Sequence, residues 1–295
     1  MASLSAADMA YVTDLVYRES AIVLEAGKEY LVETRLARIV RDEGLASIGD
    51  LVTRLRGSSA TALHGAVVEA MTTNETSFFR DAHPFDALRT DVLPALIERR
   101  ASQRALSIWS AACSSGQEAY SIAMLLREHF PALAGWRLRI YGTDLSQAIV
   151  ERAREGRYRG HEVNRGLPSA MLVKYFEQQG SDWVVRAPLR ELCEFSRGNL
   201  LGTLPVPRAL DVVFLRNVLI YFDLETRRTV LRRVRDLLAP DGWLALGGVE
   251  TTLGIDESWH RVALGRSSFY RPSAEPAAVA AGARVSPWPA QRDRA

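Results

Sequence analysis

The chain has 295 residues, of which 47% are hydrophobic, so it can bury the core of one large domain or of two smaller ones. Its formal net charge of +2 is too small for a nucleic-acid-binding protein that relies on a basic face. Cys113 and Cys193 stand alone without metal-ligand spacing, so we expect no metal site and no disulfide. No apolar run is long enough for a membrane span, and charged residues interrupt the N-terminal apolar residues. We therefore predict a cytoplasmic protein that is not inserted in a membrane.

The first 70 residues carry helical periodicity without a convincing strand. Helices are predicted at residues 6–19, 29–43 and 48–55, and Gly27, Gly44 and Gly57 separate or end them. We predict an all-α N-terminal domain over residues 1–70.

The second part of the chain, residues 71–272, changes to short β-rich runs that alternate with helical patterns. Strands are expected at 106–111, 138–144, 193–199, 211–217, 243–248 and 267–271, and helices at 117–129, 147–155 and 224–238. This alternation is typical of an α/β domain with a doubly wound, mostly parallel sheet, whose ligands bind beyond the carboxyl ends of the strands.

Two segments depart from the alternation. Residues 158–192 contain short mixed runs, which indicate a small insertion with a β-hairpin. Residues 273–295 are rich in Ala and Pro without apolar periodicity, so a disordered tail is predicted there.

Residues 71–81, MTTNETSFFRD, place short polar side chains directly before Phe78, Phe79 and Arg80. This mixture suits a ligand pocket, with hydrogen-bonding arms, two apolar walls and a permanent positive charge. The alternative is the start of an amphipathic helix with Thr73 or Asn74 as its N-cap.

Further candidate residues follow the predicted strands. A turn of small residues, 111–116, joins the first strand to a helix, and Asp144 ends the next strand, where a carboxylate can accept hydrogen bonds from both ribose hydroxyls of a nucleoside. Glu118 in the first helical turn would repel a diphosphate, which favours the cationic S-adenosylmethionine over NAD. Asp144 could instead be an N-cap, and Glu118 could merely complement the helix dipole.

Polar residues also stand at the ends of the next two strands of the prediction. Asn199 ends one of them, Arg216 and Asn217 end the other, and Tyr221 lies four residues after Asn217. Since the carboxyl ends of parallel strands share one sheet edge, we expect these side chains to converge on one cleft. A turn-forming role for each asparagine and a core position for Tyr221 are the alternatives.

Six segments in this order resemble the successive motifs of the chemotaxis receptor glutamate methyltransferases, the CheR family, and the resemblance covers residues 10–272. They are MTTNETSFFRD, WSAACSSGQEAYSIAM, YGTDLSQAIVERAREGRY, RGNLL, DVVFLRNVLIYF and LLAPDGWLALGGVE. The resemblance implies a Rossmann-like S-adenosylmethionine-dependent methyltransferase domain, an N-terminal all-α domain and a small inserted antiparallel β-subdomain at 158–192.

The same resemblance implies residue roles. S-adenosylmethionine, which leaves as S-adenosylhomocysteine, would be held by Asn74, Thr76, Arg80, Glu118, Asp144, Asn199, Leu200, Arg216 and Asn217. Arg80 and Tyr221 would lie beside the reacting groups.

A further candidate surface is basic. Arg35, Arg38 and Arg41 recur every three residues of one predicted helix and so form a stripe. The stripe could be an ordinary solvated face. With the resemblance, it becomes a docking surface for the cytoplasmic methylation helices of chemoreceptors. We expect a monomer that binds these receptors and no nucleic acid.

Three other functions remain open from the residues. The chain could be a methyltransferase for another substrate, or an S-adenosylmethionine-binding signalling or scaffold module without turnover. Arg80 and Tyr221 argue against a pure binding module, which has no use for such a pair. An NAD-dependent oxidoreductase is disfavoured because the glycine fingerprint GxGxxG is missing.

Overall fold

The structure, a computed structural model, describes residues 4–25, 27–57 and 62–273. Apart from Ser273, the predicted tail lies outside the described residues. No helix within these ranges combines the length and the apolar character needed to cross a bilayer.

Four helices form the N-terminal part: α1 (Ala6–Ser20), α2 (Glu29–Asp42), α3 (Ile48–Arg56) and α4 (Ala62–Met71). Ser5 and Ser47 cap α1 and α3, because each side chain accepts a hydrogen bond from a backbone N–H of the first turn. Residues of all four helices share a hydrophobic cluster of their own. The three predicted helices are confirmed to within one residue at each end. Helix α4 was not predicted, because its apolar residues are not confined to one face.

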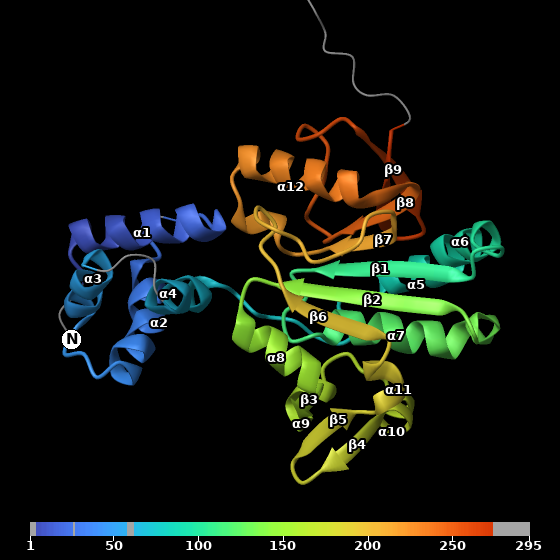
Figure 1. The fold of residues 1–295 in the computed structure, drawn as a ribbon, viewed down its shortest axis with the longest axis horizontal. Coiled ribbons are helices and arrows are strands. Elements are labelled where there is room, and N and C mark those ends of the chain that lie inside the picture. Colours follow the sequence, from blue (N-terminus) through green and yellow to red (C-terminus); the bar gives the residue numbers. More distant parts are fainter. Residues whose placement is uncertain (1–3, 26, 58–61, 274–295) are drawn as a thin grey trace, which may run out of the picture.

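The rest of the chain is built on a seven-stranded sheet of order β6-β2-β1-β7-β8-β10-β9 (Figure 1). The first five strands in this order pair in parallel, whereas β10 is antiparallel to both β8 and β9. The bounds are β1 (Ala105–Ala111), β2 (Arg137–Asp144), β6 (Cys193–Arg197), β7 (Leu210–Leu215), β8 (Leu238–Leu246), β9 (Trp259–Leu264) and β10 (Ser267–Pro272). The predicted α/β class with a mostly parallel sheet is confirmed, and β9 is an additional strand at the antiparallel edge.

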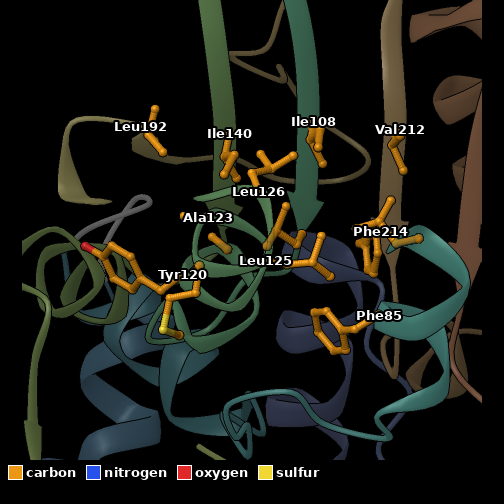
Figure 2. Packing of buried hydrophobic residues seen from close by; sticks show 14 of the residues in the cluster. Phe85, Ile108, Tyr120, Ala123, Leu125, Leu126, Ile140, Leu192, Val212 and Phe214 are labelled. Atoms are coloured by element: carbon orange, nitrogen blue, oxygen red, sulfur yellow. The ribbon is translucent and has the colours of Figure 1, made fainter. Parts of the chain in front are cut away.

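Helices cover both faces of this sheet, because alternate strand residues point to opposite sides. On one face, Ile108 and Val212 pack with residues of α7 (Gln117–His129), α8 (Gln147–Glu155) and α5 (His83–Ala87) (Figure 2). On the other face, Trp109 and Val213 pack with α12 (Leu224–Leu237). The π-helix η1 (Leu88–Val92) and α6 (Leu93–Arg99) continue α5, and η2 (Pro131–Leu133) follows α7.

The predicted insertion is a three-stranded antiparallel sheet of order β3-β5-β4, below the main sheet in Figure 1. Its elements are β3 (Arg157–Arg159), α9 (Gly160–Val163), α10 (Ser169–Tyr175), β4 (Phe176–Gln179), β5 (Asp182–Val185) and α11 (Ala187–Arg190). The antiparallel subdomain expected from the sequence is therefore confirmed.

An ion-pair network closes the amino ends of the central strands. Arg100, 12% exposed, donates to Asp211 at 2.8 Å and to both oxygens of Asp241 at 2.6 and 3.0 Å. Asp211 is buried and also accepts from the backbone N–H of Ser107. Hydrogen bonding to Asp241 raises the pKa of Arg100, and the guanidinium in turn lowers the pKa of Asp241. Arg100 thus links the helical segment before β1 to strands β7 and β8.

Replacing Arg100 with Met should lower the free energy of unfolding by about 3 kcal/mol, because it leaves the Asp211 carboxylate buried without its cation. Urea denaturation followed by circular dichroism measures this loss. Arg99→Met is the matched control: Arg99 is 40% exposed and lies 3.5 Å from Asp241, so its removal should cost less than about 1 kcal/mol. Equal losses in the two variants would contradict a special contribution of Arg100.

Candidate active site

A cavity lies at the carboxyl ends of the parallel strands and encloses about 1010 Å³, including the part open to solvent. Every residue predicted to hold the cofactor or to act in catalysis lines it: Asn74, Thr76, Arg80, Glu118, Asp144, Asn199, Leu200, Arg216, Asn217 and Tyr221. These residues come from the segment before α5, the first turn of α7, the end of β2, and the segments that follow β6 and β7. The structure therefore brings Asn74 and Tyr221, which are 147 positions apart in the sequence, to the same cavity.

The segment 71–81 is mostly not helical, so the alternative of a capped helix start is wrong for it. It runs along the cavity, and the carbonyl oxygen of Asn74 accepts a hydrogen bond from the Ser114 hydroxyl at 2.9 Å. Arg80 donates to the carbonyl oxygen of Glu75 at 3.0 Å, which folds the guanidinium back along the segment.

The expectation that Phe78 and Phe79 wall the pocket is wrong. Phe78 is fully buried and packs edge-on against Tyr158 and Phe176 at centroid distances of 5.1 and 5.5 Å, while Phe79 packs on Phe85. Apolar rings gain more from a core between the sheet and the β-subdomain than from an open cavity. The two rings fasten the segment, and its polar residues face the cavity.

Asp144 holds the loop after β1. Its carboxylate accepts from the backbone N–H of Ser114 at 2.8 Å and from that of Ser146 at 3.2 Å. Burial raises the pKa of Asp144, and these hydrogen bonds oppose the rise. The N-cap of α8 is Ser146 rather than Asp144, so the capping alternative for Asp144 is wrong.

Arg216 is the central charge of the site, with 2% of its side chain exposed. It donates to Glu118 at 2.9 Å and to both the backbone oxygen of Arg80 and the carboxylate of Asp81 at 2.9 Å. Glu118 also accepts from the Ser110 hydroxyl at 2.7 Å. The Glu118 carboxylate is therefore neutralised within the protein and does more than complement the helix dipole.

Asn199 is occupied by protein contacts on both ends of its amide. Its nitrogen donates to the backbone oxygen of Glu19 at the end of α1, and its oxygen accepts from the backbone N–H of Leu201, each at 2.9 Å. Its side chain therefore ties the helical domain to the loop after β6. The neighbouring Leu200 is buried against the cavity.

Two glutamates that the sequence did not single out also organise the site. Glu69 in α4 accepts from the Ser146 hydroxyl and from the backbone N–H of Gln147, both at 3.0 Å. Glu250 accepts from the backbone N–H groups of Asn217, Val218, Leu219 and Gly247 at 2.7 to 2.9 Å. Motif spacing could not have shown either role, because most of the partners are backbone groups and most of them belong to distant segments.

Cavity residues include several with left-handed backbone. Ala112, Ser114 and Asn217 have φ of 54°, 50° and 57°, a region that non-glycine residues adopt at a cost. Asn217 is held there by Glu250, and Ser114 by Asp144. Gly116 has φ of 92°, and a Cβ on it would lie 3.0 Å from Ala153, so only glycine suits the turn before α7.

The buried thiol of Cys113 lines the same cavity. Burial raises the pKa of Cys113 well above its ordinary value, so the thiol stays protonated and is not a nucleophile.

The donor set fits S-adenosylmethionine. Asp144 offers the carboxylate that ribose hydroxyls need, and Leu145 and Leu200 offer apolar contacts suited to an adenine ring. Arg216 lines the cavity, and its buried Nε has no hydrogen-bond partner among the described residues. Asn74, Thr76 and Arg80 add polar groups from the facing segment.

Fold and cavity together define the class of protein: an S-adenosylmethionine-dependent methyltransferase. Residues 74–266 match the protein family described as "CheR methyltransferase, SAM binding domain". Residues 7–72 match the family described as "CheR methyltransferase, all-alpha domain". The chain belongs to the CheR methyltransferase family.

Curated relatives are similar over most of their length. The chain is 40% identical over 254 residues to chemotaxis protein methyltransferase 1 of Pseudomonas aeruginosa, covering 85% of this chain and 92% of the relative. It is 38% identical over 262 residues to chemotaxis protein methyltransferase Cher2 of Pseudomonas putida, with coverages of 87% and 95%. A chemotaxis protein methyltransferase of Vibrio parahaemolyticus is 37% identical over 256 residues, with coverages of 86% and 92%. This chain is accordingly a methyltransferase of chemotaxis signalling.

The arginine stripe does not behave as one surface. Arg35 donates to the backbone oxygen of Met71 at 2.6 Å and to the Thr73 hydroxyl at 3.2 Å, so it fastens the segment that enters the cavity. Arg38 and Arg41 are exposed, and Arg38 lies 3.6 Å from Asp42. Arg38 and Arg41 remain candidates for docking, and Arg35 has a structural role in addition.

Glu250→Gln should weaken S-adenosylmethionine binding about tenfold and lower the melting temperature. The amide has one acceptor oxygen, and its NH₂ group would face backbone N–H donors, so part of the loop after β7 loses its partners. Titration calorimetry and thermal unfolding measure the two effects. The exposed Glu225, which lies 3.7 Å from Arg228, gives the control Glu225→Gln, for which we expect no change. Wild-type cofactor affinity in Glu250→Gln would show that the loop holds its shape without this carboxylate.

Proposed function

We propose that the protein transfers a methyl group from S-adenosylmethionine to glutamate side chains on the cytoplasmic methylation helices of chemoreceptors, forming glutamate methyl esters. The observation that carries the proposal is the position of Arg80 and Tyr221, which line the same cavity as Asp144 and Glu118 within a chain of the CheR family. We further propose that it acts in the cytoplasm as a monomer and binds no nucleic acid.

A glutamate carboxylate is already ionised at neutral pH, because its ordinary pKa is about 4.3. The protein therefore needs no general base. Bound cofactor would supply an electrophilic methyl group on a sulfonium. The work of the protein is to remove water from the carboxylate and to hold one of its oxygens in line, so positioning and desolvation dominate the rate gain.

Arg80 and Tyr221 both line the cavity and suit this task. One guanidinium nitrogen of Arg80 is already bonded to the backbone oxygen of Glu75, which leaves the group oriented but only partly available. A stronger ion pair would favour the reactant carboxylate, because charge disappears between carboxylate and sulfonium in the transition state. The Tyr221 backbone oxygen accepts from the N–H of Val23 at 3.0 Å, which fixes the residue against the helical domain.

Docking of the receptor is proposed to involve Arg38 and Arg41, with Arg35 shaping the entrance. Methylation helices that carry glutamates are acidic, so exposed arginines on α2 would attract them over several ångströms and increase the association rate.

The proposed reaction can be tested directly. The protein is incubated with S-adenosylmethionine labelled in its methyl group and with a chemoreceptor signalling fragment. We expect label on the receptor that is released as methanol by mild base, as a methyl ester requires. Label that withstands base would indicate another acceptor atom, and no label on a receptor fragment together with intact cofactor binding would support a scaffold function.

Arg80→Ala and Tyr221→Phe should lower the turnover number, Arg80→Ala on the order of 100-fold, because a misplaced carboxylate loses the in-line geometry. Cofactor affinity should fall much less, since Asp144 and the loops around it are untouched. Single-turnover methylation and titration calorimetry separate the two effects. Wild-type turnover in both variants would remove the roles proposed for these side chains.

A further inference from the structure

Large apolar side chains are exposed on the segments that border the cavity. Among the described residues, six of them come from three segments around Tyr221, and we call this set the apolar rim: Tyr17, Val23, Ile220, Leu224, Val249 and Leu253. The most exposed are Val249 at 82% and Leu253 at 84%. Clustered exposed apolar groups mark an interaction surface, whereas scattered ones do not.

Hydrogen bonds hold these segments together. Val23 follows α1 and bonds through its backbone N–H to Tyr221, which ends the short helix η3 (Leu219–Tyr221). The Tyr17 hydroxyl donates to Asp223 at 2.6 Å, and Asp223 caps α12, whose first residue is Leu224. Glu250, between Val249 and Leu253, accepts from the N–H of Leu219 at 2.8 Å. The three segments that carry the rim are therefore bonded to one another at η3 and at the start of α12.

The part of the rim at Tyr17, Val23 and Ile220 is hollowed and leads to the cavity, and Leu224, Val249 and Leu253 lie outside the hollows. Two hollows, of about 1590 and 1240 Å³ including open space, share Ile22, Val23, Leu24 and Asp223. The first is also lined by Tyr17, and the second by Ile220. The second hollow further shares Ile22, Met71, Thr73, Tyr221 and Phe222 with the cavity. An apolar groove thus runs over the surface and ends at Tyr221.

Charge changes sign along the groove: the first hollow is lined by Asp14, Glu29 and Asp223 without a cation among the described residues, whereas the second hollow is weakly positive. Three cations, Lys28, Arg35 and Arg227, line the second hollow with two acids, Glu25 and Asp223. Lys28 pairs with Glu25 at 2.5 Å, and Asp223 is engaged by Tyr17 and by the N–H of Thr226. Arg227 donates through Nε to the backbone oxygens of Leu219 and Phe222 at 2.9 and 2.8 Å. Its charge and that of Arg35 remain near the entrance to the cavity.

We propose that the apolar rim is the docking surface for the substrate segment, and that its occupant is an amphipathic helix with an apolar stripe next to the glutamate to be methylated. This inference rests on the proposed function. A carboxylate that reaches Tyr221 must be carried on a chain that lies over η3, so that chain covers Val23 and Ile220. Its apolar stripe seats on the rim, and its acidic side faces Arg35 and Arg227.

The rim and the exposed arginines of α2 then contribute differently. Burial of apolar surface depends little on salt, whereas attraction by Arg38 and Arg41 is screened by it. The rim lowers the dissociation rate of the helix and orients its glutamate. The arginines increase the association rate.

Two double variants test the rim: Val23→Ser with Ile220→Ser, and Val249→Ser with Leu253→Ser. Each should raise the KM for a chemoreceptor fragment about tenfold, because about 1.4 kcal/mol of apolar contact is lost. The Kd of S-adenosylmethionine should change less than about twofold. Direct binding of the fragment, measured by fluorescence anisotropy, should weaken by the same factor at low and at high salt.

The matched control is Val173→Ser, which changes a valine that is 73% exposed on α10 of the β-subdomain and should leave both measurements unchanged. Arg38→Glu gives the contrasting case, in which binding weakens at low salt and recovers relative to wild type at high salt. Wild-type binding and KM in both double variants would show that the apolar rim is not the docking surface, and the proposed function would remain intact. A loss that vanishes at high salt, or one shared by Val173→Ser, would also overturn the docking role of the rim. If the wild-type protein methylates no receptor fragment, the proposed function fails, and the anisotropy measurement still decides whether the rim binds the helix.

Discussion

The rest of the site depends on the ion pairs of the buried Arg216 guanidinium. A cation that is 2% exposed must be neutralised, and its partners Glu118 and Asp81 come from the first turn of α7 and from the segment before α5. Satisfying this one charge therefore fixes β7, α7 and residues 71–81 against one another. All three segments, counting Arg216 directly after β7, contribute residues to the wall of the cavity.

This constraint explains why strained backbone collects at the cavity. Residues 71–81 must both contact Arg216 and place Phe78 in the core beside the β-subdomain. The segment therefore turns at Phe79 and Asp81, whose φ values are 47° and 58°. The Phe78 ring, packed against Tyr158, offsets this cost through burial. The β-subdomain thus supports the cofactor cleft from beneath, in addition to any role on its own surface.

Much of the fold could be predicted from the sequence because its patterns are local. Helices α7 and α8 begin and end at the predicted residues, since Gly116 and Gly156 bound them and their apolar periodicity is regular. Convergence at the sheet edge followed from the rule for parallel strands. Helix α4 was missed because its apolar residues are not confined to one face, and α5, α6 and β9 were missed because tertiary contacts specify them. The role of Glu250 was equally hidden, since it binds backbone groups that look alike in every sequence.

The cavity draws part of its wall from outside the methyltransferase sheet. Ser20 and Ile22, from the end of α1 and just beyond it, line it together with Met71 at the end of α4. A ligand in the cavity therefore touches both parts of the molecule at once, and its binding free energy is linked to their association. By reciprocity, anything that displaces α1, including a partner seated on it, must change cofactor affinity by the same factor that the cofactor changes affinity for that partner. If the proposed receptor helix seats there, cofactor and receptor are thermodynamically coupled through this short stretch of chain.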